Sequence, residues 1–275
     1  MSKNMDRETK YLDCGSPVSS SNAVHHDNVA SQVQHPPPLC LDKEVPSIED
    51  LCPPFEKYEK IELPVDIVQV VVKDDELLNC SVYLENLCRS TVPRVGKVYF
   101  GEITSEDGNK VKVALLRCGE SSGTAGGSQN VALNAIDYLK PKAIICTGFC
   151  GCINPDRAKL GDVVISTTLA TYEHKKVGKD GEEDRNKRVD VSRNMGYRIR
   201  SAADGWKAPI DRKRSNYKVK VHTDRGMLSG PELVNNDKRR KQLLDKFPMA
   251  VGIEMEGEGI SFVILSYTVY QTVRL

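Results

Sequence analysis

Three glutamates are spaced two residues apart near the end of the sequence. Glu254, Glu256 and Glu258 occur in the stretch "GIEMEGEGI", and Met255 separates the first two. On an extended strand Glu254 and Glu256 share one face, while Met255 points to the other. A carboxylate at the end of a strand can accept hydrogen bonds from both hydroxyls of a vicinal diol such as a ribose. The alternative is that these acids lie at the N-terminus of a helix, where its dipole stabilises negative charge.

Two glycine-rich stretches offer a second kind of site, built from backbone groups. Residues 123–130, "GTAGGSQN", lead into a predicted helix, so their amides can meet an anion or a sugar hydroxyl. Residues 147–151, "TGFCG", carry glycines that let the backbone approach a ligand closely. An ordinary tight turn explains residues 123–130 equally well. Neither a G-K-[ST] phosphate loop nor a G-x-G-x-x-G after the first strand is present, which disfavours a dinucleotide-dependent oxidoreductase.

Alternating strands and helices must position these groups. The β-branched run "VDIVQVVV" at residues 65–72 is typical of a strand buried on both faces. A helical spacing follows in residues 73–87, and residues 175–190 are charged and predicted to form an excursion loop. Further strands are predicted at 96–103, 110–118, 142–148, 161–174, 217–230 and 249–256, and further helices at 130–139, 192–206 and 231–247.

This order of elements predicts an α/β fold. Three loops follow buried strands, at residues 73–77, 119–129 and 148–155. In an open α/β sheet, ligands bind at the carboxyl ends of the strands. We therefore expect the functional residues to lie in these loops and at the "EMEG" boundary.

The N-terminal segment differs from the rest of the chain. Residues 1–60 are rich in Ser, Asn, His and Pro and show no apolar period, so they are predicted to be a disordered tail and linker. The adjacent His25 and His26 can bind a metal ion, but solvated side chains are the expected state, and no metal site is predicted. Residues 61–260 then form the domain, and residues 261–275 a divergent end.

The composition disfavours nucleic-acid-binding, membrane-spanning and zinc-binding classes of protein. The 275 residues carry a formal net charge of +1, which gives no general attraction to nucleic acid or to an anionic membrane. The basic stretches "DRKRS" and "DKRRK" lack interleaved aromatic residues, which favours a solvated face. Nine scattered cysteines without zinc spacing indicate reduced thiols. The longest apolar run, residues 260–270, is too short to span a bilayer, which needs about 20 residues. A cytoplasmic protein is expected.

Three motifs together resemble one family. The stretches "AIICTGFCGCINPDRAKLGDVVIS", "LSGPELVNNDKRR" and "GIEMEGEGI" occur in that order and are similar to the nucleoside phosphorylase and nucleosidase superfamily. This group includes purine nucleoside and uridine phosphorylases and methylthioadenosine/S-adenosylhomocysteine nucleosidase. The resemblance covers roughly residues 64–260. It implies a three-layer α/β/α fold with a central mixed, mostly buried sheet, and cleavage of the N-glycosidic bond of a nucleoside.

The resemblance also implies a set of site residues. Glu256 would hold the ribose hydroxyls, Met255 would line the sugar and base, and Glu76 would position the attacking water. Beside them, Gly148, Phe149 and Cys150 match the loop next to the ribose and nucleophile, whereas Ser229, Gly230 and Leu233 match the segment under the base. No metal or organic cofactor is implied. Family members form dimers, trimers or hexamers, so a homo-oligomer is possible.

Some positions depart from the family pattern. Phosphorylases of the hexameric type grip phosphate with an Arg and a Ser, and the matching residues here are Cys146 and Phe149. Phosphate as a co-substrate is therefore disfavoured, and hydrolysis is favoured. Leu233 replaces an aromatic residue that stacks on the base in nucleosidases, and Leu stacks poorly.

Residues 261–275 depart most from the family pattern. The family continues after the "EME" motif with a helix, a strand and a Ser-Asp pair that serves base protonation. Here residues 261–275 are β-branched and aromatic, and no Asp occurs after Asp245. We expect a truncated form, from a gene model or a splice variant, that lacks the general acid. The predicted function is cleavage of a purine nucleoside or thionucleoside with impaired activity. The alternative is a catalytically inactive nucleoside-binding or interaction module.

Overall fold

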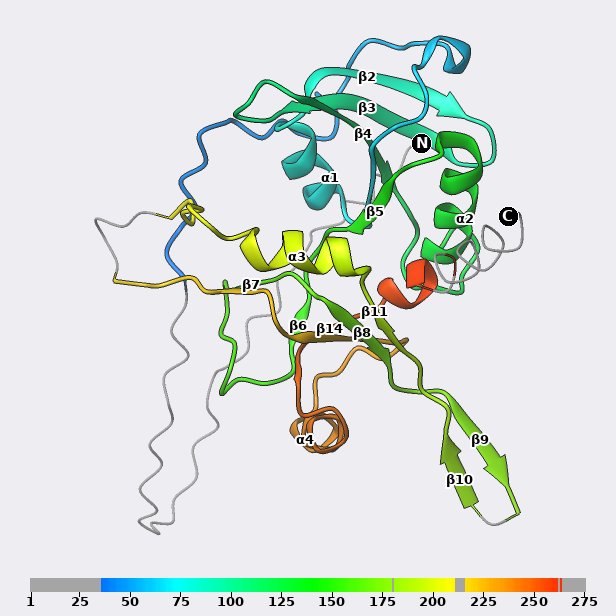
Figure 1. Cartoon of the computed structure of the whole chain (residues 1–275), viewed down its shortest axis with the longest axis vertical. Helices are drawn as coiled ribbons and strands as arrows, with labels where there is room; N and C mark the ends of the chain where they lie inside the picture. The colour runs from blue at the N-terminus through cyan, green and yellow to red at the C-terminus, as the bar shows by residue number, and fades with distance from the viewer. Residues whose placement is uncertain (1–35, 180, 211–215, 262, 264–275) are drawn as a thin grey trace, which may run out of the picture. The chain divides into compact units, whose positions relative to one another are not determined.

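The computed structural model describes residues 36–179, 181–210, 216–261 and 263 (Figure 1). All of them belong to one compact unit, residues 35–275. The labelled α-helices are α1 (Asp74–Ser81), α2 (Ser128–Leu139), α3 (Arg193–Ser201) and α4 (Asp237–Lys246), and a 3-10 turn, η1, spans Tyr58–Lys60. Residues 257–261 are also helical. None of the described helices is long and apolar enough to cross a membrane.

The strands form two five-stranded mixed sheets and two short pairs. The first sheet has the order β2-β3-β4-β1-β5, and the second has the order β11-β8-β13-β14-β6. The strands of the first sheet are β1 (Ile67–Val71), β2 (Glu85–Val92), β3 (Gly96–Thr104), β4 (Lys110–Arg117) and β5 (Ala143–Cys146). The strands of the second are β6 (Gly151–Cys152), β8 (Thr168–Thr171), β11 (Arg188–Asp190), β13 (Gly226–Ser229) and β14 (Ala250–Glu254). The pairs are β7 (Val163–Val164) with β12 (Val221–His222), and β9 (Lys175–Gly178) with β10 (Gly181–Asp184).

The first sheet is buried on both faces. Side chains alternate along β1, so Val68 and Val70 enter a core with α2, whereas Val71 enters a second core with α1. The strand β4 does the same, with Leu116 on the α2 side and Leu115 on the α1 side. This explains why β1 has a continuous β-branched sequence, and it confirms the predicted α/β class with helices on both sides of a mixed sheet.

The second sheet has a smaller core. Buried side chains of β8, β13 and β14 and of the flanking segments pack against Leu243 of α4. Tyr172, which directly follows β8, is the largest fully buried side chain of the described residues. Figure 1 shows α4 beside this sheet and the β9–β10 hairpin projecting from it.

Sequence patterns placed several element boundaries wrongly. The helical spacing in residues 73–87 predicted a helix that reaches Leu87, but α1 ends at Ser81 and Leu87 lies in β2. The reason is that β2 pairs with β3 along most of its length, and this pairing overrides the local spacing. The predicted helix at residues 231–247 begins only at Asp237, because the Asn236 side chain accepts a hydrogen bond from Arg239 N and caps it there.

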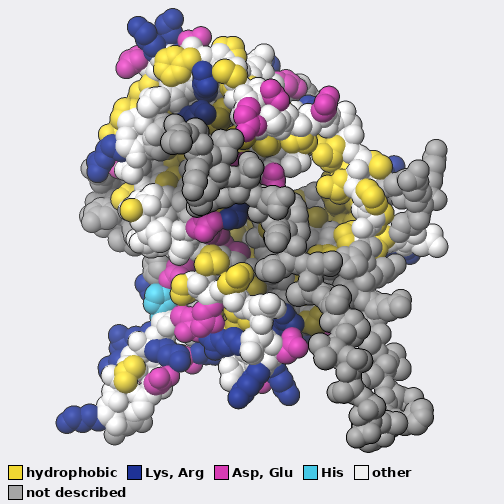
Figure 2. Space-filling model, turned by 180° about the vertical axis from the view of Figure 1, so that it is seen from behind, with side chains coloured by type: hydrophobic (Ala, Val, Ile, Leu, Met, Phe, Trp, Pro, Cys, Tyr) yellow, Lys and Arg dark blue, Asp and Glu magenta, His cyan; other side chains and the backbone are white. Residues whose placement is uncertain are grey.

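Long predicted strands are divided in the structure. Residues 161–174 form β7 and β8, and residues 217–230 form β12 and β13. The strands β8 and β13 belong to the second sheet, whereas β7 and β12 pair with each other. The predicted excursion loop at 175–190 contains the β9–β10 hairpin and β11. Lys and Arg side chains gather over this hairpin and α4, with Asp and Glu side chains between them (Figure 2).

The folded unit extends beyond the predicted domain on its N-terminal side. Of the predicted tail, residues 1–35 lie outside the described residues. Leu51 is buried in the core on the α1 side of the first sheet, and Leu39 forms a bridge with Ile210. Of residues 261–275, only 261 and 263 are described, and Val263 belongs to the core on the α2 side.

Two sets of parallel strands end where the predicted loops begin. In the first sheet β4, β1 and β5 run parallel, and Val71 lies opposite Arg117 while Val70 lies opposite Cys146. In the second sheet β8, β13 and β14 run parallel, and Ser229 lies opposite both Thr171 and Glu254. The predicted loops therefore follow aligned strand ends, where side chains from separate strands can meet.

Candidate active site

Glu76 joins the end of β1 to the loop after β5. It occupies the third position of α1, and its Oε2 accepts hydrogen bonds from Val72 N at 2.8 Å and Lys73 N at 2.9 Å. The bond to Lys73 N is a helix-capping contact of the kind expected for Glu at this position. The other oxygen, Oε1, accepts from Phe149 N at 3.0 Å, across 73 residues of sequence. Glu76 is thus more than a cap, because it binds the backbone of a second loop.

Gly148 makes this contact possible. A Cβ at this position would lie 2.7 Å from Glu76 Oε1 and 3.1 Å from its Cδ, so any larger residue would displace the carboxylate. The neighbouring Phe149 has an exposed fraction of 80%, and Cys150 is also exposed. The structure therefore brings Glu76, Gly148 and Phe149 together on an accessible surface.

Glu256 reaches the glycine-rich loop of the first sheet. Its Oε1 accepts a hydrogen bond from Ser121 N at 2.9 Å. The same loop binds the backbone of the motif, because Ser122 Oγ donates to Met255 O at 2.9 Å. Ser121 has a φ of 71°, which is uncommon outside glycine and turns its amide toward the carboxylate. The loop that could have met an anionic ligand thus meets an anionic side chain of the protein.

One oxygen of Glu256 remains available. Within the described residues, its Oε2 forms no hydrogen bond, whereas Oε1 is held by Ser121 N. A carboxylate oxygen carries two lone pairs and can accept from two hydroxyls. The side chain is half-buried, so it is oriented by the protein while one oxygen can still accept from a ligand.

Glu254 has a different environment, although it lies only two residues away. Its Oε2 accepts from Glu256 N at 2.9 Å and Gly257 N at 2.8 Å, and thereby shapes the turn that presents Glu256. Among the described residues, its buried Oε1 has no partner in hydrogen-bonding geometry, although the Ser229 hydroxyl is near enough to favour the ionised form. Burial dominates and raises the pKa of Glu254. These contacts give Glu254 a structural role in the turn.

Ser229 and Gly230 lie at the end of β13, beside Glu254. Ser229 is buried, and its Oγ accepts a hydrogen bond from Glu258 N at 2.8 Å. Gly230 packs on Tyr172 so closely that a Cβ would lie 2.7 Å from the ring. Leu233 is different, because 89% of its side chain is exposed and it belongs to none of the three apolar cores of the described residues.

The cysteines near the site are poor nucleophiles. Cys146, at the end of β5, is reached by solvent, yet the protein surrounds its sulfur closely, and this desolvation together with the charge of Glu254 raises the pKa of the thiol. Desolvation and Glu254 also raise the pKa of Cys150. Thiols with raised pKa values stay protonated near neutral pH, and the thiolate is the reactive form. A covalent thiol mechanism is therefore disfavoured.

A lysine that sequence reasoning missed lies among the carboxylates. Lys73 forms an ion pair with Glu120 of the glycine-rich loop, and this contact raises the pKa of Lys73 most, with smaller contributions from Glu76 and Glu256. Its position directly after the buried strand β1 was the available signal. The ion pair joins the β1–α1 junction to the loop that holds Glu256.

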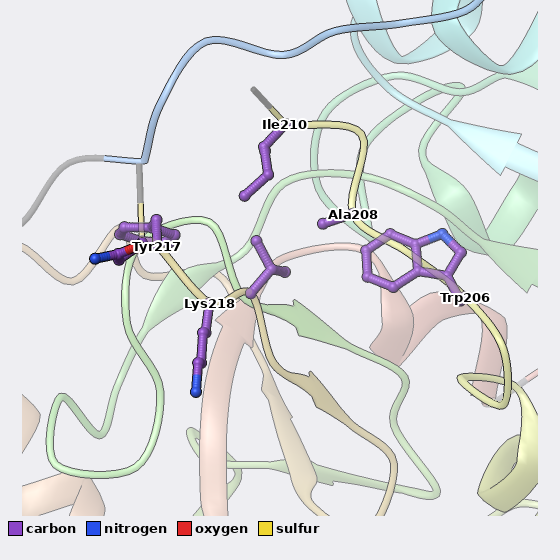
Figure 3. A pocket seen from close by; sticks show the side chains of 7 residues that line it. Trp206, Ala208, Ile210, Tyr217 and Lys218 are labelled. Carbon is purple, nitrogen blue, oxygen red and sulfur yellow. The ribbon is translucent and has the colours of Figure 1, made fainter. Parts of the chain in front are cut away.

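A separate hollow lies away from these residues. It has a volume of about 660 Å³ and is lined by residues from the segments on either side of 211–215, among them Trp206, Tyr217 and Lys218 (Figure 3). Among the described residues that line it there is no carboxylate. In the part of the chain that the structure describes, no three His, Cys, Asp or Glu side chains are placed to hold a metal ion. His25 and His26 lie outside that part.

Comparison with known families decides the class of protein. A sequence model of the phosphorylase superfamily matches residues 70–265, which is more than half of the chain. The chain belongs to the phosphorylase superfamily. The resemblance to nucleoside phosphorylases and nucleosidases, inferred from three motifs, is thereby confirmed.

Sequence relatives of this phosphorylase-superfamily chain include two 5'-methylthioadenosine/S-adenosylhomocysteine nucleosidases. That of Maridesulfovibrio salexigens is 29% identical over 167 residues, covering 59% of this chain and 66% of the relative. That of Desulfotalea psychrophila is 29% identical over 177 residues, covering 60% and 63%. The match thus spans less than two thirds of either relative. A Death domain-containing ATP nucleosidase of Amphimedon queenslandica is 30% identical over 163 residues, covering 52% of this chain and 30% of that protein.

Solved structures confirm the fold of this superfamily member. The 5'-methylthioadenosine/S-adenosylhomocysteine nucleosidase from Neisseria meningitidis, in complex with methylthio-immucillin-A, aligns with a TM-score of 0.57 at 18% identity, over 75% of this chain and 81% of that chain. The S-adenosylhomocysteine nucleosidase from Streptococcus pyogenes, in complex with 5-methylthiotubericidin, aligns with a TM-score of 0.57 at 17% identity, over 74% and 79%. At these identities the likeness establishes the α/β fold alone.

Proposed function

We propose that the protein cleaves the N-glycosidic bond of a purine nucleoside or thionucleoside by hydrolysis. The observation that carries the proposal is the pair of anchored carboxylates at the strand ends. Glu76 is held by three backbone amides and Glu256 by one, with Glu256 Oε2 left to accept from a ligand. The superfamily membership and the adenosine-derived names of the sequence relatives support a purine substrate.

The two carboxylates take different roles in this reaction. Glu256 accepts hydrogen bonds from the ribose hydroxyls, and its negative charge stabilises the oxocarbenium-like sugar as the bond breaks. Glu76 orients a water molecule whose oxygen forms the new bond to C1′ and whose proton leaves through the carboxylate. The electron pair of the C1′–N bond departs with the base, which takes up a proton from water.

Hydrolysis is favoured over phosphorolysis by two residues at the end of β5. Cys146 and Phe149 stand where hexameric phosphorylases have the Arg and Ser that grip phosphate, and neither side chain can bind a phosphate anion in that way. Cys146 carries a thiol with a raised pKa, and Phe149 is exposed and apolar. An anion there would also meet Glu76 and Glu254, whose negative charges disfavour it.

A direct assay tests the proposal. The chain is incubated with adenosine, inosine or methylthioadenosine, with and without phosphate, and free base is measured. We expect base release that does not need phosphate, and a loss of about 10²-fold in kcat/KM for Glu256→Gln. The control is Glu120→Gln, because Glu120 lies in the loop that holds Glu256 and, among the described residues, its carboxylate pairs with Lys73 alone. Release only with phosphate would exclude hydrolysis, and undiminished release by Glu256→Gln would exclude the assigned site.

A nucleoside-binding protein without turnover is the second candidate. The observation that favours it is that Glu76 already accepts three backbone hydrogen bonds, from Val72, Lys73 and Phe149, so its carboxylate has less capacity to orient a water molecule. This candidate requires that a nucleoside raises the melting temperature while no base is released. Base release above the uncatalysed rate would reject it.

A further inference from the structure

The segment of residues 229–233 is held by contacts on three sides. At its start, Gly230 N donates to Glu254 O at 3.2 Å, which ties it to β14. In its middle, Tyr172 Oη donates to Glu232 O and accepts from Glu232 N, both at 3.3 Å. Leu233 then projects into solvent. The backbone of the segment is therefore placed by its neighbours, although its last side chain is open to a ligand.

Arg239 makes the contacts on the third side of the 229–233 segment. From α4, its Nε donates to Glu232 Oε2 at 2.8 Å and its Nη2 donates to Glu232 Oε1 at 3.2 Å, which is a two-point contact. The same Nη2 also forms an ion pair with Glu173, which follows Tyr172 after β8. One guanidinium thus joins three separate parts of the chain: α4, the segment after β13 and the segment after β8. Arg239, Glu173 and Glu232 together form a clamp.

The clamp has the geometry of a strong ionic contact. All three side chains are partly shielded from solvent, with exposed fractions of 30% for Arg239 and 27% and 37% for its partners. Two-point arginine–carboxylate contacts of this kind fix orientation as well as distance. Without the guanidinium, Glu173 and Glu232 would face each other as two negative charges. Their repulsion would move the segment away from Tyr172.

We propose that Arg239 is a positioning residue, which sets the place of the 229–233 segment through Glu232 and so determines how tightly the purine base is bound. The inference rests on the proposed function and on the resemblance that matches Ser229, Gly230 and Leu233 to the segment under the base. Arg239 itself touches no substrate. It keeps Gly230 against Tyr172 and presents the exposed end of the segment, with Leu233, to the base.

The sequence provides a matched control on the same helix. Arg240 follows Arg239 directly, and its ion pair is with Asp237, three residues earlier in α4, at 2.7 Å. Replacing Arg240 with Met removes the same charge and the same kind of ion pair from α4. It leaves the clamp and the 229–233 segment untouched.

The test compares steady-state kinetics and amide exchange in the full chain. For Arg239→Met we expect KM to rise about tenfold while kcat changes less than about twofold, because a displaced segment binds the base less tightly in the ground state and in the transition state alike. Arg239→Lys restores part of the affinity, since Lys can contact one carboxylate but not both. Adding Glu173→Gln to Arg239→Met removes the repulsion and lowers KM by about threefold. Arg240→Met leaves KM unchanged.

Hydrogen exchange of the amides of residues 230, 232 and 233 supplies a readout that needs no substrate. We expect these amides to exchange faster in Arg239→Met and at the wild-type rate in Arg240→Met. If KM is equal in Arg239→Met and Arg240→Met while the wild type releases base, the clamp role is rejected and the proposed function stands. If the wild type neither binds a nucleoside nor releases base, both are rejected. Should Arg239→Met fail to fold, the Arg239→Lys variant decides by the same comparison.

Discussion

The first sheet and the second sheet end at the same site but are held by different forces. The first sheet has an apolar core on each face, with α1 on one side and α2 on the other. The second sheet has one smaller core against α4, and much of what fixes its strand ends is polar: the clamp, the Tyr172–Glu232 bonds and the His174–Glu258 contact. Rigid packing therefore supports Glu76, whereas directional bonds place the 229–233 segment.

The two acids of the "EME" motif show the same contrast on a smaller scale. Glu254 is turned inward, where its carboxylate binds the amides of its own turn and burial raises its pKa. Glu256 is turned across to the first sheet, where Ser121 N holds one oxygen and leaves the other available. Two identical residues in one motif thus differ in their surroundings, because one supports its own turn and the other binds a loop of the first sheet.

Removing core side chains should have the largest effect and tests the difference between the sheets. Leu116→Ala, in the core on the α2 side, should lower the free energy of unfolding by about 4 kcal/mol. Leu228→Ala, in the second-sheet core, should lower it by about 2.5 kcal/mol, because a smaller cluster can collapse further into the cavity. Denaturant unfolding measures both. Equal losses would contradict the view that the first sheet is the more rigid support.

Replacing either of two glycines with alanine should have different effects: at Gly230 it should lower stability, and at Gly148 it should lower activity. Gly230→Ala places a Cβ 2.7 Å from the buried ring of Tyr172, so it should cost about 2 kcal/mol of unfolding free energy. Gly148→Ala displaces only the end of the Glu76 side chain, so it should cost under about 1 kcal/mol but slow base release about tenfold. Thermal unfolding and the base-release assay are compared for both variants. A large stability loss in Gly148→Ala would contradict the assignment.

The raised pKa of Glu254 predicts how stability varies with pH. A carboxyl group with a higher pKa in the folded than in the unfolded state binds its proton more tightly when folded. Its contribution to stability is fully present below the unfolded value, near 4.5, and is lost as the pH rises through the folded value. Glu254→Gln should abolish that loss, which has a slope of at most about 1.4 kcal/mol per pH unit. Unfolding free energies measured from acid to neutral pH for both proteins check this, and parallel curves would contradict it.

The smallest effect is expected at the exposed ion pair between the two loops. Lys73→Met should change the free energy of unfolding by less than about 1 kcal/mol, because both Lys73 and Glu120 are largely solvated. The effect of the substitution should vanish in about 1 M salt, where charges this exposed are screened. Melting temperatures at low and high salt measure it. An effect that persists in high salt would show that Lys73 contributes by packing and not by charge.

Much of the site could be predicted because its residues are marked locally. The β-branched run of β1, the glycines around Phe149 and the "EME" motif each follow from a short pattern, and together they identified the superfamily. The expectations failed where pairing between strands overrode the local pattern of a segment. Leu87 lies in β2 because this segment pairs with β3. Within residues 175–190, β9 and β10 pair with each other and form a hairpin.

The residues that were missed have no local signature. Nothing near Ser121 in the sequence indicates that its amide meets a carboxylate 135 residues later, because that contact requires a positive φ and the alignment of two loops. Arg239 stood in a basic stretch that was interpreted as a solvated face. Its partner Glu173 lies 66 residues away, so only the folded chain shows the ion pair.

The sequence by itself indicated which strands are buried and where the backbone can approach a carboxylate. It also indicated which acids are candidates to bind a ribose. The alternation of side chains on a strand and the lack of a Cβ in glycine suffice for that. The fold alone decided which backbone amides hold Glu254 and which holds Glu256, and that Leu233 stands exposed. Those outcomes depend on which amides reach each carboxylate, and hydrogen bonds between distant segments exist only after the sheets have packed.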